Sequence, residues 1–329
     1  MLECGDALSL TDDRAVSRLL CSASAGVAPV HAFRMLAGGR ATDAISSGDL
    51  RRLLRVIASA PQGWPVAIDI LAMRFHSTFA NDGERLGMAA LGRELLLQFD
   101  PLAKSHRELG YNLATLASAC LDGPDAQNTA ATLCGALAGA FIKRTLALHE
   151  LHALVLALFR RQPMAALDAF ALASSEPEEN RNLLRMFDEF VEHFRHPLRE
   201  VSDEAILAWC AQDPGRNYEA AASCIPFSKA SAGPSVAGWS DIALQVLRRA
   251  PDRVAVLRCF VERFSPMAWS GSRAAIVEAN AALLTPIEEW DDPEVARLAR
   301  EERERLLEEA WMEREREAEW HGRRDERFE

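Results

Sequence analysis

The chain has 329 residues, of which 49% are hydrophobic and 26% charged, a balance typical of globular proteins with enough apolar material for a core. Its net charge of −11 opposes a phosphate backbone, so nucleic acid is not an expected partner. The seven cysteines form no C-x-x-C pair and lie mostly in apolar stretches, which predicts free buried thiols rather than a disulfide framework or a zinc site. The first residues lack the basic and apolar regions of a signal peptide. Together with the expected free thiols, this indicates a cytoplasmic protein.

Residues 1–44 are predicted to form short helices, because stretches of Gly, Ala and Ser interrupt the apolar pattern there. From about Ser47 apolar residues recur on one helix face, at Leu50, Leu53, Leu54 and Ile57. Further helices are predicted after Pro65, around 83–99 and around 107–121. Signals for β-hairpins are nearly absent, so the chain is predicted to be all-α.

A short pattern recurs four times along the chain. Leu stands first, apolar residues take the third and fourth places, and Pro stands eighth, at Pro61, Pro163, Pro214 and Pro251. The pattern predicts the end of one amphipathic helix, a break, and a Pro in the first turn of the next helix, where its missing N–H costs nothing. The Leu that opens each copy is predicted to be buried. Helical hairpins that recur in this way are typical of stacked helical arrays.

The most apolar part of the chain begins with 126–142, a stretch that contains no charged residue. Gly135 and Gly139 form a G-x-x-x-G motif, which in a membrane would be a helix-packing face. The stretch is shorter than the roughly 20 residues that a membrane span needs, and Lys143-Arg144 follow it directly. The sequence therefore predicts a buried helix in close contact with a neighbour, and a membrane is not an expected partner.

A helix predicted over 176–196 carries the best candidate for a metal site. Two carboxylates and two imidazoles share one of its faces: Glu189, Glu192, His193 and His196. Carboxylate-bridged metal sites combine such groups from several helices, and no second helix offers a matching set. The apolar residues of the opposite face, Leu183, Phe187, Phe190, Val191 and Phe194, instead predict that the quartet is solvated. A metal-dependent enzyme that uses this face is the alternative.

Other motifs with chemical potential are weaker. His149-Glu150-Leu-His152 is one residue short of the H-E-x-x-H spacing that places two ligands on one helix face. In Trp269-Ser-Gly-Ser-Arg273, Ser270 or Ser272 is predicted to cap a helix. The stretch 212–240, rich in Gly, Pro, Ser and Ala, is predicted to be a long loop. We expect no catalytic, cofactor-binding or metal-binding residue, and no enzymatic activity.

The C-terminal segment 291–329 is the most highly charged part of the chain, with 15 acidic and 9 basic residues. It is predicted to form a long helix that docks at its start and projects at its end. One interpretation is a polar helix that caps a helical array. The other is that Trp311, Trp320 and Phe328 anchor a protein partner, because aromatic residues surrounded by charge are frequent interface hot spots.

One segment resembles a known family. Asp291 is followed by Val295 and Ala299 at the spacing found in the second helix of HEAT repeats, and the hairpins described above are similar to that family in length and apolar spacing. The resemblance to the HEAT/armadillo family implies an irregular α-solenoid. It divides the chain into short N-terminal helices over 1–44, a HEAT-like region over 45–290 and a charged helix over 291–329.

The same resemblance implies a non-catalytic scaffold or recognition module for protein partners, and it carries over no catalytic residue. We expect the chain to act as part of a larger bacterial complex. The Arg-rich, Lys-poor C-terminal segment also resembles helical modules of large bacterial proteins that include conflict-system sensors. A sensor or recognition subunit of an anti-phage system is therefore a second alternative.

Overall fold

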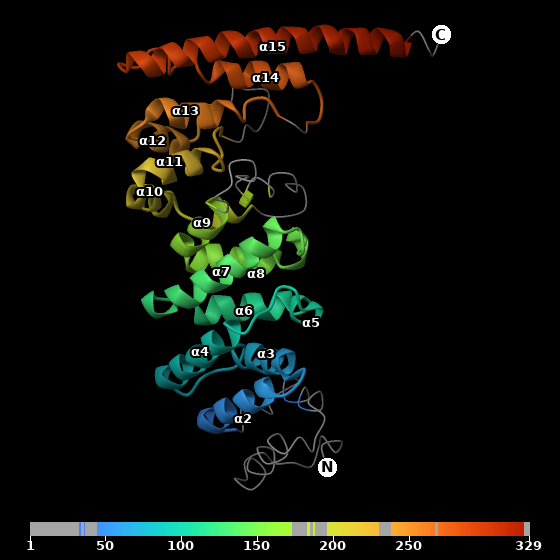
Figure 1. Ribbon diagram of the computed structural model, residues 1–329, viewed down its shortest axis with the longest axis vertical. Helices are drawn as coiled ribbons and strands as arrows, with labels where there is room; N and C mark the ends of the chain where they lie inside the picture. Colours follow the sequence, from blue (N-terminus) through green and yellow to red (C-terminus); the bar gives the residue numbers. More distant parts are fainter. Residues whose placement is uncertain are drawn as a thin grey trace. The chain divides into compact units, whose positions relative to one another are not determined.

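The computed structural model describes residues 45–172, 196–229, 238–266 and 269–325, together with Phe33, Leu36, Leu183, Leu184 and Phe187. In these residues the fold consists of 14 α-helices and three short 3-10 helices (Figure 1). No strand forms within this part of the chain, where an isolated bridge joins Ser228 to Trp239. The all-α prediction is confirmed.

The chain divides into two compact units. The N-terminal unit comprises Met1–Glu179 and Phe190–Val201, and the C-terminal unit comprises Asn180–Glu189 and Ser202–Glu329. The boundaries expected from the sequence, near 44 and 290, stay predictions.

In the N-terminal unit, helices pack mainly on helices that lie one to three places away along the chain. Its elements are α2 (Ser47–Ser59), α3 (Gly63–Arg74), α4 (Asp82–Leu96), α5 (Lys104–Arg107), α6 (Gly110–Cys120), η3 (Pro124–Ala126), α7 (Gln127–Ile142), η4 (Leu148–Glu150), α8 (His152–Arg161), α9 (Pro163–Ala171) and η6 (Pro197–Glu200). The helix predicted from Ser47 is confirmed as α2, and its four predicted apolar residues are all buried. The helix predicted after Pro65 corresponds to α3, which begins two residues earlier at Gly63, and the helices predicted around 83–99 and 107–121 correspond to α4 and α6.

The C-terminal unit contains α10 (Asp203–Gln212), α11 (Pro214–Ala222), α12 (Asp241–Arg249), α13 (Arg253–Val261), α14 (Arg273–Ala282) and α15 (Pro293–Asp325). Serine hydroxyls at Ser202, Ser240 and Ser272 cap three of these helices by accepting a backbone N–H three residues later. The prediction of a loop over 212–240 is wrong for 214–222, because Pro214 opens α11 there.

All four copies of the repeated pattern lie at the junction of two packed helices. Pro163 and Pro214 stand at the first helical position, as predicted. Pro61 and Pro251 instead stand two residues before α3 and α13, so the prediction is wrong for them. At Pro251 the reason is local: the following Asp252 is the N-cap and accepts the Ala255 N–H at 2.8 Å, which places Pro outside the helix.

The leucines of the repeated pattern also divide into two pairs. Leu54 and Leu207 are buried, whereas Leu156 and Leu244 are only partly buried, against the prediction. The core-facing residues of α12 are Ile242, Ala243, Val246 and Leu247. Leu244 follows Ala243 by about 100° around the helix and therefore lies at the flank of that face.

The helix predicted over 126–142 forms as α7 and packs one buried side against α9, but the G-x-x-x-G motif does not make a tight contact. Gly135 is exposed, and no atom of another segment lies within 4 Å of the position that a Cβ would take at Gly135 or Gly139. The close approach is at Gly92 of α4, where a Cβ would collide with the thiol of Cys120 on α6. Among the helices described, none has both the length and the apolar character needed to cross a membrane.

Side chains link neighbouring hairpins through the carbonyl groups at helix ends, which have no partner within their own helix. The buried indole N–H of Trp64 donates to the Leu95 carbonyl at 2.8 Å, and that of Trp239 donates to the Leu283 carbonyl at 2.6 Å. Arg263 likewise donates to the Ala222 carbonyl at 3.1 Å. Each unit is therefore held together by directed polar links as well as by apolar packing.

Candidate partner-binding surface

The first half of α15 docks through apolar side chains. Its buried residues are Val295, Ala296, Leu298, Ala299, Leu306 and Ala310. They recur at helical spacing and form one stripe, which packs against α13 and α14. We call this side of α15 the docked face.

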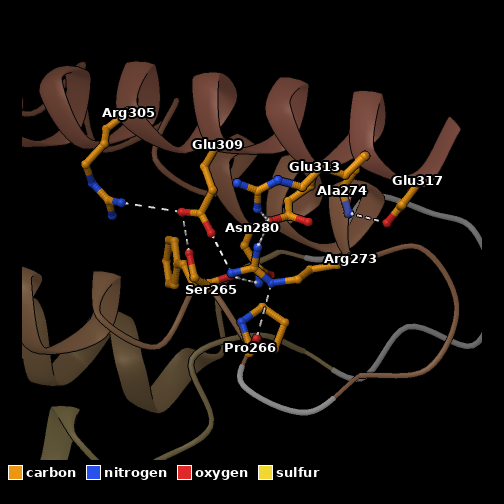
Figure 2. Close-up of polar contacts among 11 residues, drawn as sticks. Ser265, Pro266, Arg273, Ala274, Asn280, Arg305, Glu309, Glu313 and Glu317 are labelled. Carbon is orange, nitrogen blue, oxygen red and sulfur yellow. Dashed lines mark hydrogen bonds and ion pairs between the residues drawn. The ribbon is translucent and has the colours of Figure 1, made fainter. Parts of the chain in front are cut away.

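The docked face continues beyond Ala310 with carboxylates instead of apolar groups. Figure 2 shows Glu309, Glu313 and Glu317 directed from α15 toward the start of α14. The Arg273 guanidinium, 17% exposed, lies 2.7 Å from a carboxylate oxygen of Glu309 and 2.7 Å from one of Glu313. Arg273 also lies over the Trp269 ring, 5.3 Å from its centroid. One cation thus joins the α13–α14 loop, α14 and two turns of α15.

Glu317 binds the N-terminus of α14 directly. Its carboxylate accepts the Ala274 N–H at 3.2 Å and the Ser272 hydroxyl at 2.7 Å. An anion is favoured here, because the first N–H groups of a helix lack intrahelical partners and carry the positive end of the helix dipole. Ser272 is the N-cap of α14, which confirms the predicted capping role for this segment.

These contacts extend the docked part of α15 to Glu317, further than the sequence predicts. The sequence indicates docking only at the start of the helix, because large apolar residues are few beyond Ala310. The structure replaces apolar burial by ion pairs and hydrogen bonds along the same face. In Figure 1 α15 then continues past α14 toward its C-terminal end.

The opposite side of α15 is solvent-exposed and carries large apolar residues. Leu307, Trp311 and Met312 are 37%, 60% and 44% exposed, respectively. Exposed glutamates stand beside them, at Glu301, Glu304, Glu308 and Glu315. We call these seven residues the outward face.

The three aromatic residues predicted to bind a partner do not share one surface. Trp311 and Trp320 are nine residues apart, which at about 100° per residue places them on opposite sides of the helix. Trp311 lies on the outward face, whereas Trp320, 59% exposed, lies on the same side as Leu306 and Glu313. Phe328 lies outside the described residues. Trp311 is therefore the aromatic residue at the centre of the candidate partner-binding surface.

The metal quartet falls largely outside the described part of the chain, which omits Glu189, Glu192 and His193. His196 is described: its Nδ1 accepts the Leu198 N–H at 3.2 Å and caps η6. In the residues that the structure describes, no group of three or more His, Cys, Asp or Glu is placed to hold a metal ion. The prediction of a solvated quartet is not tested.

The remaining sequence candidates have structural roles. Glu150 pairs with Arg107 at 3.1 Å and accepts the Ala147 N–H at 3.1 Å, so it fixes the segment before α8. The free thiols of Cys120, Cys134 and Cys210 are buried, and burial raises the pKa of each to about 12. A thiol with such a pKa is protonated at neutral pH and is a poor nucleophile. The buried-thiol prediction is confirmed for these cysteines.

An open depression lies between α10 and α12. Its lining includes Asp203, Leu207, Gln245 and Arg249. Burial raises the pKa of the Asp203 carboxyl, and the nearby carboxylates of Glu204 and Asp241 raise it further. The depression offers polar contacts on a broad surface rather than an enclosed pocket.

No protein-family model, no curated protein and no solved structure matches this chain.

Proposed function

We propose that the chain is a non-catalytic module for protein–protein interaction, built from hairpins stacked as an irregular α-solenoid. Three observations support the stacking. Helices pack mainly on near neighbours in the sequence, the repeated pattern coincides with hairpin junctions, and side chains such as Trp64 bind helix-end carbonyls of the next hairpin. Such arrays act through extended surfaces rather than through an enclosed catalytic pocket.

The partner-binding surface in this proposal is the outward face of α15. The observation that carries it is the position of Trp311, which is 60% exposed on a helix whose other side is anchored by Arg273. A rigid backbone that presents a large aromatic side chain to solvent lowers the entropic cost of binding. Trp is also among the residues most enriched at interface hot spots.

The test is a selection of displayed random peptides on the immobilised full-length chain. The selected peptides are then measured against three variants: Trp311→Ser, Leu307→Ser and the control Trp320→Ser. We expect binding to weaken by about tenfold or more in the first two variants, in line with hot-spot losses, and to change little in the control. Circular dichroism and thermal melting verify that all variants fold.

Two results would contradict the proposal. In the first, the selected peptides bind the Trp311→Ser and Leu307→Ser variants as tightly as the unmodified chain. In the second, repeated selections return no peptide above background. Either result would remove α15 as the binding surface.

A further inference from the structure

Three residues of the outward face of α15, Glu304, Leu307 and Trp311, belong to a run with the spacing of a helix-pairing seam. Glu304, Leu307, Trp311, Arg314 and Ala318 follow one another at alternating intervals of three and four residues. This is the spacing of the a and d positions in a coiled coil, where a second helix packs along the seam. All five residues are exposed, and Leu307 and Trp311 form the apolar centre. The spacing and exposure of these residues thus fit an amphipathic helix as the partner.

On one flank of this seam the charges are all negative, whereas Arg314 within the seam pairs with Glu278 of α14. Glu301, Glu308 and Glu315 recur every seven residues, about 10.5 Å apart along the helix, and flank Leu307 and Trp311 on one side. In the described part of the chain Glu308 and Glu315 have no ion pair, whereas Glu301 pairs with Arg297 of the same helix. Charges at these flanking positions determine which helix can pair with the seam.

A second copy of this chain is a poor occupant. In an antiparallel pair centred on Leu307 and Trp311, Glu308 would face its own counterpart and Glu301 would face Glu315 of the other copy, so like charges would meet. In a parallel pair the facing positions would be Arg303 and Ala310. These lie toward the docked face, where Arg303 pairs with Glu288 and Ala310 is buried.

We infer that the outward face of α15 binds a cationic amphipathic helix, whose apolar stripe packs on Leu307 and Trp311 and whose flanking Lys or Arg residues pair with Glu301, Glu308 and Glu315. The inference rests on the proposed function and specifies the class of partner. An interface of this size, centred on two apolar side chains, is suited to weak and transient binding. Arginine in the partner gains additional binding energy when it stacks on the exposed Trp311 ring.

The test uses two synthetic helical peptides of 21 residues with Leu at the a and d positions. One carries Lys at the flanking positions, and the other carries Glu. Binding of each labelled peptide to the full-length chain is followed by fluorescence anisotropy at two salt concentrations. We expect the Lys peptide to bind at least about tenfold more tightly than the Glu peptide at low salt, and the difference to shrink at high salt.

Variants of the full-length chain separate specific binding from general attraction to an acidic protein. Reversing Glu301, Glu308 and Glu315 to Lys should weaken binding of the Lys peptide at least about tenfold. A control that reverses three other exposed glutamates changes the net charge equally and should alter binding by less than about threefold; these are Glu219, Glu262 and Glu289. Trp311→Ser leaves the charge unchanged and should also weaken binding about tenfold or more.

The outcomes distinguish this inference from the proposed function. If both charge-reversal variants weaken binding equally, the attraction is nonspecific and the inference is wrong. If the Glu peptide binds as tightly as the Lys peptide and Trp311→Ser still abolishes both, the surface binds helices but not by charge. If sedimentation shows a dimer of the unmodified chain that Trp311→Ser dissociates, the occupant is a second copy. If Trp311→Ser has no effect on any peptide, the proposed function fails as well.

Discussion

Removal of the Arg273 guanidinium should loosen the second half of α15. Arg273→Met keeps most of the aliphatic side chain but removes both 2.7 Å ion pairs to Glu309 and Glu313. Exposed ion pairs contribute about 0–1 kcal/mol, whereas removing one partner of a buried pair costs about 3–5 kcal/mol. Arg273 is 17% exposed, and Arg305 and Arg316 remain beside the two carboxylates, so an intermediate loss of about 1–3 kcal/mol follows.

The quantity to measure is the free energy of local opening of α15, obtained from native-state hydrogen exchange of its amides. The control is Arg300→Met, because Arg300 is exposed on the side of α15 away from α14. A double-mutant cycle that combines Arg273→Met with Glu313→Gln should give a coupling free energy of about 1 kcal/mol or more. Strictly additive losses, or equal losses in Arg273→Met and Arg300→Met, would show that the ion pairs do not hold the helix.

Three further predictions concern the stability of the N- and C-terminal units, measured by urea denaturation. Leu54→Ala should cost about 2–5 kcal/mol because Leu54 is fully buried, and Leu244→Ala should cost clearly less because Leu244 is partly exposed; equal losses would contradict this. Gly135→Ala should stabilise the chain by about 0.5–1 kcal/mol because it adds a helix-favouring side chain in open space, whereas Gly92→Ala should destabilise it through collision with α6. Burial lowers the pKa of the His106 imidazole, so the unfolded chain binds a proton more readily, and stability should fall as pH drops below about 6.5. His106→Asn should remove part of that loss, and an unchanged pH dependence of stability in this variant would contradict the prediction.

Helix identity could be predicted well from the sequence because the signals are local. The apolar spacing of Leu50, Leu53, Leu54 and Ile57 fixes one face of α2, and those residues are all buried. Helix caps could also be predicted: Ser272 precedes α14, and its hydroxyl accepts a backbone N–H of the first turn. Such features depend on residues within one or two turns, which the sequence displays directly.

What the sequence could not show depends on groups far apart in the chain. The ion pairs of Arg273 with Glu309 and Glu313 join positions 36 and 40 residues apart, and no periodic pattern marks them. The close contact at Gly92 depends on Cys120, while the G-x-x-x-G motif points to Gly135, which is exposed. A motif of small residues permits close packing, but only the neighbouring helix determines where it occurs.

The candidate surface was predicted in part. Trp311 could be selected because a large aromatic residue in a charged helix is unusual, but grouping it with Trp320 ignored the 180° that separates them. The row of Glu301, Glu308 and Glu315 was present in the sequence, with a spacing of seven residues that could have been recognised. The row can be assigned to a binding surface only once the docked face shows which side of the helix is exposed.

The hydrogen bonds from side chains to helix-end carbonyls limit how the chain can be shortened. A fragment that ends between Trp64 and Leu95, or between Trp239 and Leu283, would leave the indole N–H of the tryptophan without its acceptor. An unpaired buried group of this kind costs about 1–3 kcal/mol, in addition to the apolar surface newly exposed at the cut. Expression fragments should therefore retain at least two consecutive hairpins, and a single excised hairpin is not an autonomous building block for grafting onto another protein.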